Sequence, residues 1–228
     1  MTGIDEQEVL RSDTRRAEAF SDGVLAIVIT LLVLDLQPPA TRPGQLAQAL
    51  LEQWPTYLAY VTSYLYVGVV WLNHKAAFMH IHSMSVGLHW MNLAVLATAA
   101  LLPFPTAVIA EGMQLGDLAD QRTAVVLYAS VGTLLCLSWL GFFHYLARHP
   151  ELVEERLGGG FFRGERRRAA AGLVLYALAG ALGVLVSPWL ASGIFLGLPI
   201  FFGLTSHGLF MLQDLTHGRG RARRGGRA

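Results

Sequence analysis

The chain consists mostly of long apolar runs separated by short polar, glycine-rich or proline-rich breaks. A helix needs about 20 mostly apolar residues to cross the hydrocarbon core of a bilayer. Six segments meet this requirement, at residues 16–36, 54–80, 86–110, 123–146, 169–188 and 189–212. The pattern predicts an all-α, polytopic membrane protein with six transmembrane helices per subunit.

Prolines predict a break in the third segment and a turn between the last two segments. Pro103 and Pro105 lie inside the third segment, where they should break or end the helix and leave backbone carbonyls in need of partners. The last two segments are separated only by Pro188 and its neighbours, so they form either a tight helical hairpin or one broken element. We predict the hairpin.

Composition supports the membrane assignment. Of the 228 residues, 54% are hydrophobic and only 14% are charged, whereas a soluble domain carries about 25% charged residues. The first fifteen residues are polar, and no apolar stretch with a small-residue cleavage site follows them. We therefore expect the first apolar run to be a retained helix. The one cysteine, Cys136, excludes an intrachain disulfide bond.

The arginines predict the orientation of the chain, because Lys and Arg collect on the cytoplasmic side. They cluster before the first helix, between the fourth and fifth helices, and in the segment 218–228, while only Arg42 and Arg122 lie on the other side. We expect a multi-pass protein of the cell membrane with both termini in the cytoplasm. Residues 1–217 form the single six-helix domain, and residues 218–228 form a disordered Arg/Gly-rich tail. This tail either contacts anionic lipid or serves only as a topology signal.

The first helix carries the most informative pattern. Ile27, Leu31 and Leu34 share one helix face at about 100° per residue, and Asp22 points about 140° away from Ile27. A carboxylate inside the membrane is costly and so has a functional or structural task. If the apolar stripe faces a pore, Asp22 faces neighbouring helices and anchors them. The alternative is a stripe that faces lipid or packs against protein. The hydroxyl of Thr30 either reaches the lumen or bonds to its own helix.

The second helix offers partners for this carboxylate. Trp71, Asn73 and His74 carry hydrogen-bond donors, and with Asp22 they could form a network between helices. The alternative is that they mark the water interface, where Trp and His are common.

Motifs of other functional classes are absent from the sequence. The potassium filter Thr-Val-Gly-Tyr-Gly, a Walker loop, Gly-x-Ser-x-Gly and His-Glu-x-x-His do not occur. The histidines at 74, 80, 82 and 89 lack the spacing and the cysteines of a metal or haem site. We expect no enzyme activity, no cofactor and no nucleic-acid partner.

These residues together resemble the transmembrane protein 175 family of lysosomal and bacterial potassium-permeable channels. The resemblance rests on Arg16, Phe20-Ser21-Asp22, Ala26-Ile27 and the run from Thr30 to Leu34, then on Trp71, Asn73-His74, Asn92 and Pro103-Phe104-Pro105. It is specific over the first three helices, whereas the last three are only compatible in hydropathy.

The resemblance implies a homotetramer in which the first helix of each subunit lines a central pore. It further implies that Ile27, Leu31 and Leu34 form the constriction and that Thr30 contributes to selectivity. The network that holds the pore helix in place would comprise Arg16, Phe20, Ser21, Asp22, Trp71, Asn73 and His74. The implied partners are other copies of the chain, membrane lipid and permeant potassium ions.

A ring of bulky apolar side chains resists hydrated ions and gates by dewetting. Such a ring favours potassium modestly over sodium, because potassium sheds its water more easily. We therefore predict a potassium-permeable channel with a hydrophobic gate and its narrowest point at Ile27. The alternative is a proton-coupled secondary transporter in which Asp22 and His74 relay protons. A third reading, a membrane-embedded haem or metal enzyme, would require a coloured or metal-containing protein.

Overall fold

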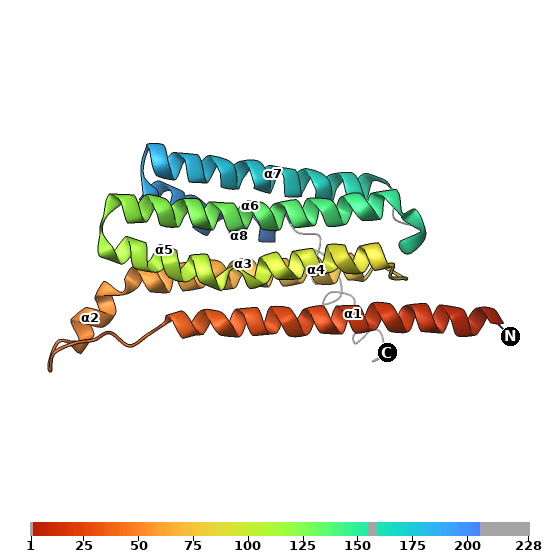
Figure 1. Ribbon diagram of the computed structural model, residues 1–228, viewed down its shortest axis with the longest axis horizontal. Coiled ribbons are helices and arrows are strands. Elements are labelled where there is room, and N and C mark those ends of the chain that lie inside the picture. Colours follow the sequence, from red (N-terminus) through yellow and green to blue (C-terminus); the bar gives the residue numbers. More distant parts are fainter. Residues whose placement is uncertain (1, 155–158, 206–228) are drawn as a thin grey trace, which may run out of the picture.

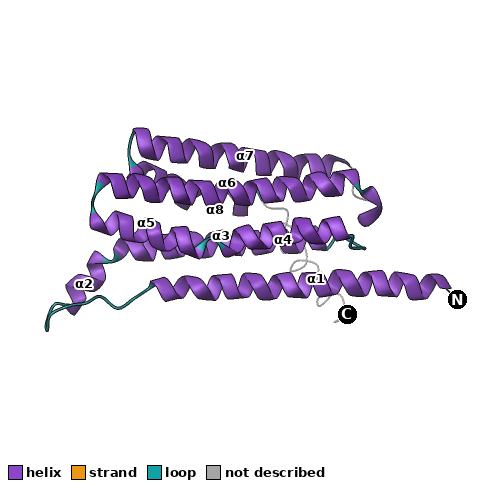
Figure 2. Cartoon of the chain, viewed as in Figure 1, coloured by secondary structure: helices purple, strands orange, loops and turns teal. Residues whose placement is uncertain are grey.

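The structure is a computed structural model that describes residues 2–154 and 159–205 (Figure 1). Within these ranges the chain is all-α, as predicted, and Figure 2 shows helices joined by loops, of which the one between α1 and α2 is extended. The helices are α1 (Thr2–Leu32), α2 (Leu46–Glu52), α3 (Trp54–Phe78), α4 (Val86–Ala100), α5 (Pro103–Leu115), α6 (Leu118–Arg148), α7 (Gly159–Leu185) and α8 (Pro188–Leu204). Short 3-10 turns follow α1 at Val33–Asp35 and α6 at Pro150–Leu152.

The long helices lie side by side in one elongated bundle (Figure 1). Helix α6 packs against α4, α5 and α7, and α3 packs against α1, α5 and α8. Helix α1 lies along one edge of the bundle, opposite α7, and packs mainly against α3 and α4. Only 28% of the most apolar window of α1 is buried, so most of this helix faces away from its own subunit.

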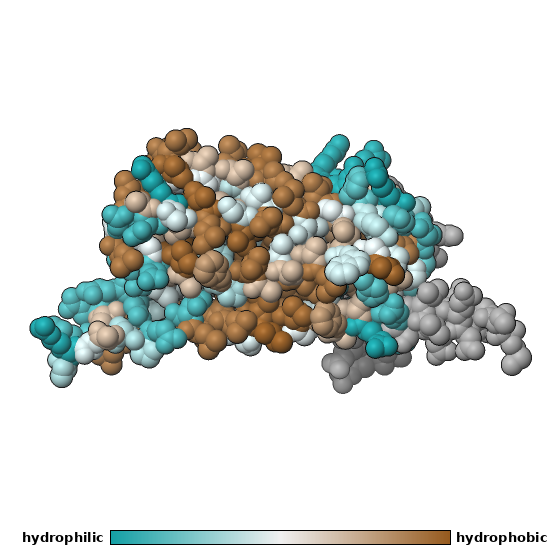
Figure 3. Space-filling model, in the orientation of Figure 1, coloured by the Kyte–Doolittle hydropathy of each residue, from teal (hydrophilic) through white to brown (hydrophobic). Residues whose placement is uncertain are grey.

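The bundle has the surface of a membrane protein. Figure 3 shows hydrophobic residues over the middle of the bundle and hydrophilic residues towards its ends. Among the described residues, four helical segments are long and apolar enough to span a bilayer: Asp13–Asp35, Val86–Leu115, Leu118–Arg148 and Gly160–Leu185. Helix α8 is a shorter apolar helix, and α3 has 25 residues but carries several hydroxyl groups. Six spans per subunit therefore stay a prediction.

The prolines act as expected. Helix α4 ends at Ala100 and α5 begins at Pro103, so the predicted break in segment 86–110 is confirmed. Proline lacks an N–H group and fits the first turn of a helix, where that group has no partner. Pro188 begins α8, which packs back on α7, so the predicted hairpin is also confirmed.

Some boundaries differ from the prediction. Helix α1 begins at Thr2 rather than near residue 16, because the polar segment before the membrane is rich in helix-forming Glu, Gln, Arg and Ala residues. Helix α7 likewise begins at Gly159 rather than 169, and α2 was not predicted. The predicted tail at 218–228 and the end of the sixth segment beyond residue 205 lie outside the described residues.

Candidate functional site

The two faces of α1 have different surroundings. Ser21, Leu25, Val28 and Leu32 are buried against the other helices of the bundle. On the opposite side the side chains of Phe20, Ile27, Leu31 and Leu34 are 55%, 60%, 42% and 61% exposed. At about 100° per residue, Ile27 points roughly 130° away from the middle of the buried face. The apolar stripe thus belongs to a surface that the subunit does not cover with its own helices.

Thr30 lies on this exposed side of α1. Its hydroxyl donates a 2.8 Å hydrogen bond to the carbonyl oxygen of Ile27, one turn earlier. This is the bond to its own helix that membrane threonines commonly make. Since the proton is used in this bond, the remaining lone pairs of Oγ1 are available as acceptors beside the stripe.

Asp22 and Ser21 hold α1 to two different helices. Nε1 of Trp71 in α3 donates to Oδ1 of Asp22 at 2.9 Å. Nδ2 of Asn92 in α4 donates to Oγ of Ser21 at 2.9 Å. Because these two attachments are adjacent in sequence but lead to different helices, they oppose rotation of α1 about its own axis.

The contact between Ser21 and Asn92 continues to His74. Oγ of Ser21 donates its proton to the carbonyl oxygen of Ala17 at 2.8 Å, so it must accept from the amide of Asn92. Oδ1 of Asn92 therefore faces His74 and accepts from its Nε2 at 2.8 Å. The chain from His74 through Asn92 to Ser21 is thus directional, and it links α3, α4 and α1.

His74 is fully buried in aromatic surroundings. Its ring stacks on Phe78 with centroids 4.3 Å apart and meets the edge of Trp139 at 6.3 Å. Nδ1 has no hydrogen-bond partner among the described residues. No group of three or more potential metal ligands occurs in the described part of the chain. The imidazole links helices by its Nε2 atom in this structure.

The other residues of the predicted network lie elsewhere. Arg16 and Phe20 are exposed on α1, and their place in the network stays a prediction. Asn73 belongs to a separate cluster, in which its Oδ1 lies 3.5 Å from Nη2 of Arg168. Nη1 of Arg168 forms 2.9 Å bonds with both carboxylate oxygens of the buried Glu165.

This second cluster joins α3, α7 and α8, because Nη2 of Arg168 also donates to the carbonyl oxygen of Phe202 at 3.2 Å. The sequence analysis missed the ion pair. The sequence does contain a signal for this ion pair, because Glu165 and Arg168 carry opposite charges three residues apart, just before an apolar segment. Asn92 was noted only as part of a family pattern, and nothing in the sequence alone paired it with Ser21 or His74.

A groove of about 780 Å³ lies between α1 and the pair α3 and α8. Asp22 and Trp71 form part of its wall, and apolar side chains such as Ile29, Leu65 and Ile200 form most of the rest. The bond between Asp22 and Trp71 thus lies at the wall of an open groove, while Leu25, Val28 and Leu32 of α1 are buried against the bundle.

Comparisons with known proteins identify the family to which the chain is similar. The model of the family described as "Endosomal/lysosomal potassium channel TMEM175" matches residues 16–103, which include both anchored residues of α1 and their partners. A potassium channel of Streptomyces collinus is 39% identical over 178 residues, covering 78% of this chain and 85% of that protein.

A crystal structure of a lysosomal potassium-selective channel TMEM175 homolog from Chamaesiphon minutus superposes with a TM-score of 0.75. It is 32% identical, and the match covers 86% of this chain and all of that one. The human endosomal/lysosomal proton channel TMEM175 is 38% identical over 97 residues, covering 39% of this chain and 19% of that protein. The similarity to the bacterial proteins thus extends over most of the chain, beyond the segment that the family model matches.

Proposed function

The chain belongs to the TMEM175 family, whose members are ion channels rather than enzymes, and we propose that it is a subunit of a potassium-permeable cation channel. One observation carries the proposal furthest. A membrane-spanning helix, α1, presents Ile27, Leu31 and Leu34 away from its subunit while Ser21 and Asp22 fix its opposite side. A helix held in this way is suited to line a pore shared between subunits.

The pore needs more than one copy, because a single α1 helix cannot enclose a path. We propose a homotetramer with four α1 helices around a central axis and the Ile27 face directed inward. Each subunit then spans the cell membrane six times with both termini in the cytoplasm, and residues 1–217 form one channel domain. The concentration of arginines at the proposed cytoplasmic ends supports this orientation.

The proposed constriction consists of Ile27, Leu31 and Leu34. Each of these positions forms one ring, to which every subunit contributes one side chain. Apolar rings of this kind exclude hydrated ions and gate by dewetting. Lone pairs of Thr30 beside the ring would partly replace the lost water around a cation. We expect potassium to pass more readily than sodium by a modest ratio, with membrane lipid around the tetramer and no cofactor.

The transporter alternative has less support from the geometry. A proton relay between Asp22 and His74 needs these groups to exchange protons with each other. Instead, Asp22 accepts from Trp71 and His74 donates to Asn92. Both groups are engaged in links between helices, which fits an anchoring role better than a relay.

The reversal potential of the purified protein in a planar bilayer tests the proposal. With potassium and sodium gradients in opposite directions, a channel of this kind gives discrete conductance steps and a reversal potential displaced toward the potassium equilibrium value. Slow, pH-dependent and saturable flux without steps would instead favour the transporter.

A further inference from the structure

The groove between α1 and the pair α3 and α8 is open to the surface and mostly apolar. Its volume of about 780 Å³ lies within the range of ordinary ligand sites, which is roughly 300–1,000 Å³. The apolar lining comes from all three helices and includes Ala26 and Ile29 of α1, Leu65 of α3 and Ile200 of α8. Leu65 and Ile200 are exposed in the subunit, so its own helices leave this apolar surface uncovered.

Gly68 keeps the α3 side of the groove open. It lies between Leu65 and Leu72, and no atom comes within 4 Å of the position that a Cβ atom would occupy. At Gly132 of α6, by contrast, that position lies 2.5 Å from the ring of Tyr176. Gly132 therefore permits close packing of two helices, whereas a side chain at Gly68 would extend into the empty groove.

The groove has about the length of one membrane leaflet. Its lining extends from Tyr64 to Leu72 on α3, which is about 12 Å at ~1.5 Å per residue. On α1 it extends from Asp22 to Ile29, which is about 10 Å by the same measure. Half of the hydrocarbon core of a bilayer is about 15 Å thick. One acyl chain that lies parallel to the helices therefore matches the groove in length and polarity.

Two opposite charges lie at one end of the groove, on the same indole ring. Oδ1 of Asp22 accepts from Nε1 of Trp71, and Nζ of Lys75 lies 5.4 Å from the centre of the Trp71 ring. The indole N–H is neutral, so it leaves the negative charge of Asp22 uncompensated. Neither Asp22 nor Lys75 belongs to an ion pair among the described residues. Both charges are therefore available to a ligand with charges of its own.

This pair of charges discriminates between lipid headgroups. An ammonium group with N–H donors complements Asp22, and a phosphate complements Lys75. A headgroup that carries only a phosphate would add a second negative charge beside Asp22, where like charges repel. The quaternary ammonium of choline has no N–H to donate to a carboxylate. Phosphatidylethanolamine has both the ammonium donors and the phosphate.

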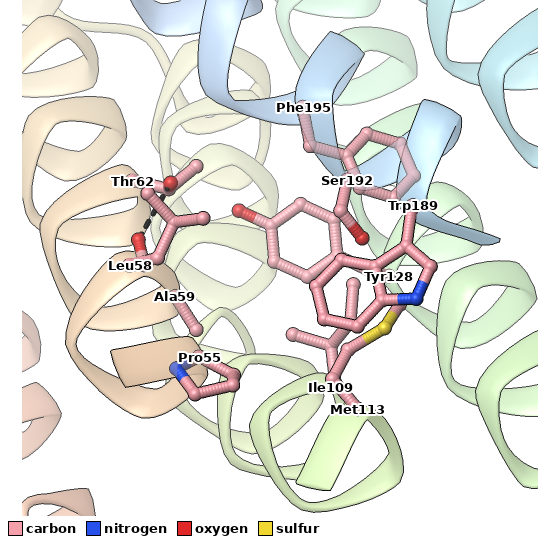
Figure 4. Close-up of a pocket in the computed structure, with 10 residues that line it drawn as sticks. All are labelled: Pro55, Leu58, Ala59, Thr62, Ile109, Met113, Tyr128, Trp189, Ser192 and Phe195. Atoms are coloured by element: carbon pink, nitrogen blue, oxygen red, sulfur yellow. Dashed lines mark hydrogen bonds between the residues drawn. The ribbon is translucent and has the colours of Figure 1, made fainter. Parts of the chain in front are cut away.

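Two cavities inside the bundle lack these properties. One measures about 40 Å³, and Figure 4 shows that its lining comes from α3, α5, α6 and α8. Its polar groups are hydroxyls such as that of Thr62, which donates to the carbonyl oxygen of Leu58. The other measures about 50 Å³ and contains Glu165 and Arg168, which already pair with each other. Both cavities are far smaller than the sites that hold ligands of lipid size.

We propose that one phosphatidylethanolamine molecule binds in this groove of each subunit. One acyl chain lies between α1, α3 and α8, the ammonium group binds Asp22, and the phosphate binds Lys75. Asp22 points about 140° away from Ile27, so the lipid lies behind the pore-lining side of α1. This placement relative to a pore rests on the proposed function. By filling the space between α1 and the bundle, the lipid stabilises the position of α1.

Two variants remove the two halves of the site separately. Gly68→Leu fills the groove, and Gly193→Leu in α8 is its matched control, because nothing lies within 4 Å of that Cβ position and Gly193 is outside the groove. Lys75→Gln removes the partner of the phosphate and leaves the groove open. Arg167→Gln is the control for this charge, because Arg167 is exposed on α7, along the edge of the bundle opposite α1.

The experiment is native mass spectrometry of the full-length, detergent-purified protein, titrated with phosphatidylethanolamine, phosphatidylcholine or phosphatidylglycerol. We expect the wild type to bind one phosphatidylethanolamine per subunit roughly tenfold more tightly than the other two lipids, which corresponds to one charge-assisted hydrogen bond. Lys75→Gln should lower this affinity to that for phosphatidylcholine. Gly68→Leu should abolish stoichiometric binding of all three lipids. Both control variants should bind as the wild type does, and thermal unfolding shows that each variant is folded.

Four results would overturn the proposed site. Equal affinities of the wild type for the three lipids would mean non-specific lipid around the protein. A preference for phosphatidylglycerol that Lys75→Gln removes would mean a site for anionic lipid. Preferential binding that ignores both variants would locate the lipid elsewhere. An oligomer that binds no lipid and that Gly68→Leu dissociates would mean that a second copy of the chain fills the groove. Because binding is measured without ion flux, its failure is distinguishable from failure of the proposed channel.

Discussion

Nε1 of Trp71 donates a 2.9 Å hydrogen bond to Oδ1 of Asp22, across 49 positions of the sequence. The bond joins the helix with the exposed apolar stripe to the adjacent helix of the same subunit, at the level where α1 enters the apolar part of the bundle. The bond gives the Asp22 carboxylate a structural partner inside the membrane helix, so a role in the permeation path is not needed to explain its presence. With Ser21 bound to Asn92 beside it, the bond attaches the side of α1 opposite to the exposed apolar stripe.

Ile27→Asn should increase potassium flux and reduce the preference for potassium over sodium. A polar amide at the constriction lowers the cost of wetting the pore. Reversal potentials and conductance in planar bilayers measure both effects. Leu178→Asn, at an exposed position of α7, is the control for a polar substitution on a membrane surface. A permeability ratio that Ile27→Asn leaves unchanged would remove Ile27 from the constriction.

Trp71→Phe should weaken the assembled protein more than it alters ion selectivity. The substitution leaves the Asp22 carboxylate without its indole donor, and losing a hydrogen bond to a charged group costs roughly 1.5–3 kcal/mol. Thermal unfolding of the detergent-purified protein and its elution as an oligomer measure the loss. Trp90→Phe, at an exposed position of α4, is the control. Equal stability of the two variants would contradict the anchoring role.

Asp22→Asn distinguishes the channel from the transporter. The channel reading predicts impaired assembly, because the charge that strengthens the Trp71 bond is gone. Any oligomer that does form should still pass potassium. The transporter reading predicts normal assembly and no transport. Size-exclusion chromatography combined with rubidium uptake on the same preparation resolves the two outcomes.

Ser21→Ala and Asn92→Ala should have non-additive effects on stability. Asn92 joins Ser21 to His74, so its removal already abolishes the bond that Ser21→Ala breaks. Residues in one hydrogen-bond network typically couple by about 0.5–3 kcal/mol. Thermal stability of the wild type, both single variants and the double variant gives this coupling. Additive losses would mean that the chain from His74 to Ser21 does not act as one unit.

Gly132→Ala should strongly destabilise the packing of α6 on α7. A Cβ atom at Gly132 would lie 2.5 Å from the ring of Tyr176, which is too close for any carbon contact. Small residues permit such close approach between membrane helices. Gly193→Ala in α8 is the matched control, because nothing lies within 4 Å of its Cβ position. A melting temperature for Gly132→Ala equal to that of the control would contradict the close contact.

The sequence predicted the elements of the fold better than their contacts. Apolar runs and prolines located the break before Pro103 and the turn at Pro188, because hydropathy and backbone restrictions are local properties. Family resemblance and helix periodicity placed Asp22 and Ile27 on opposing faces of α1. The partners of buried polar groups were harder to predict. Asn73 and His74 are adjacent in sequence, yet one reaches Arg168 and the other Asn92, and only the tertiary packing determines this division.

The unbroken length of α1 has a mechanical consequence. The helix runs from Thr2 to Leu32 without a proline or a kink-forming turn, and Ser21 and Asp22 fix it at one level. The arm from Asp22 to Thr2 is about 30 Å long at ~1.5 Å per residue, whereas the arm from Asp22 to Ile27 is about 7.5 Å long. Because Leu25, Val28 and Leu32 are buried on either side of Ile27, the short arm is packed against the bundle, and the arm toward Thr2 is longer by about four to one. A sideways pull on the N-terminal end of α1 is therefore passed along one stiff helix to the packed segment that carries Ile27, with a leverage of about four to one.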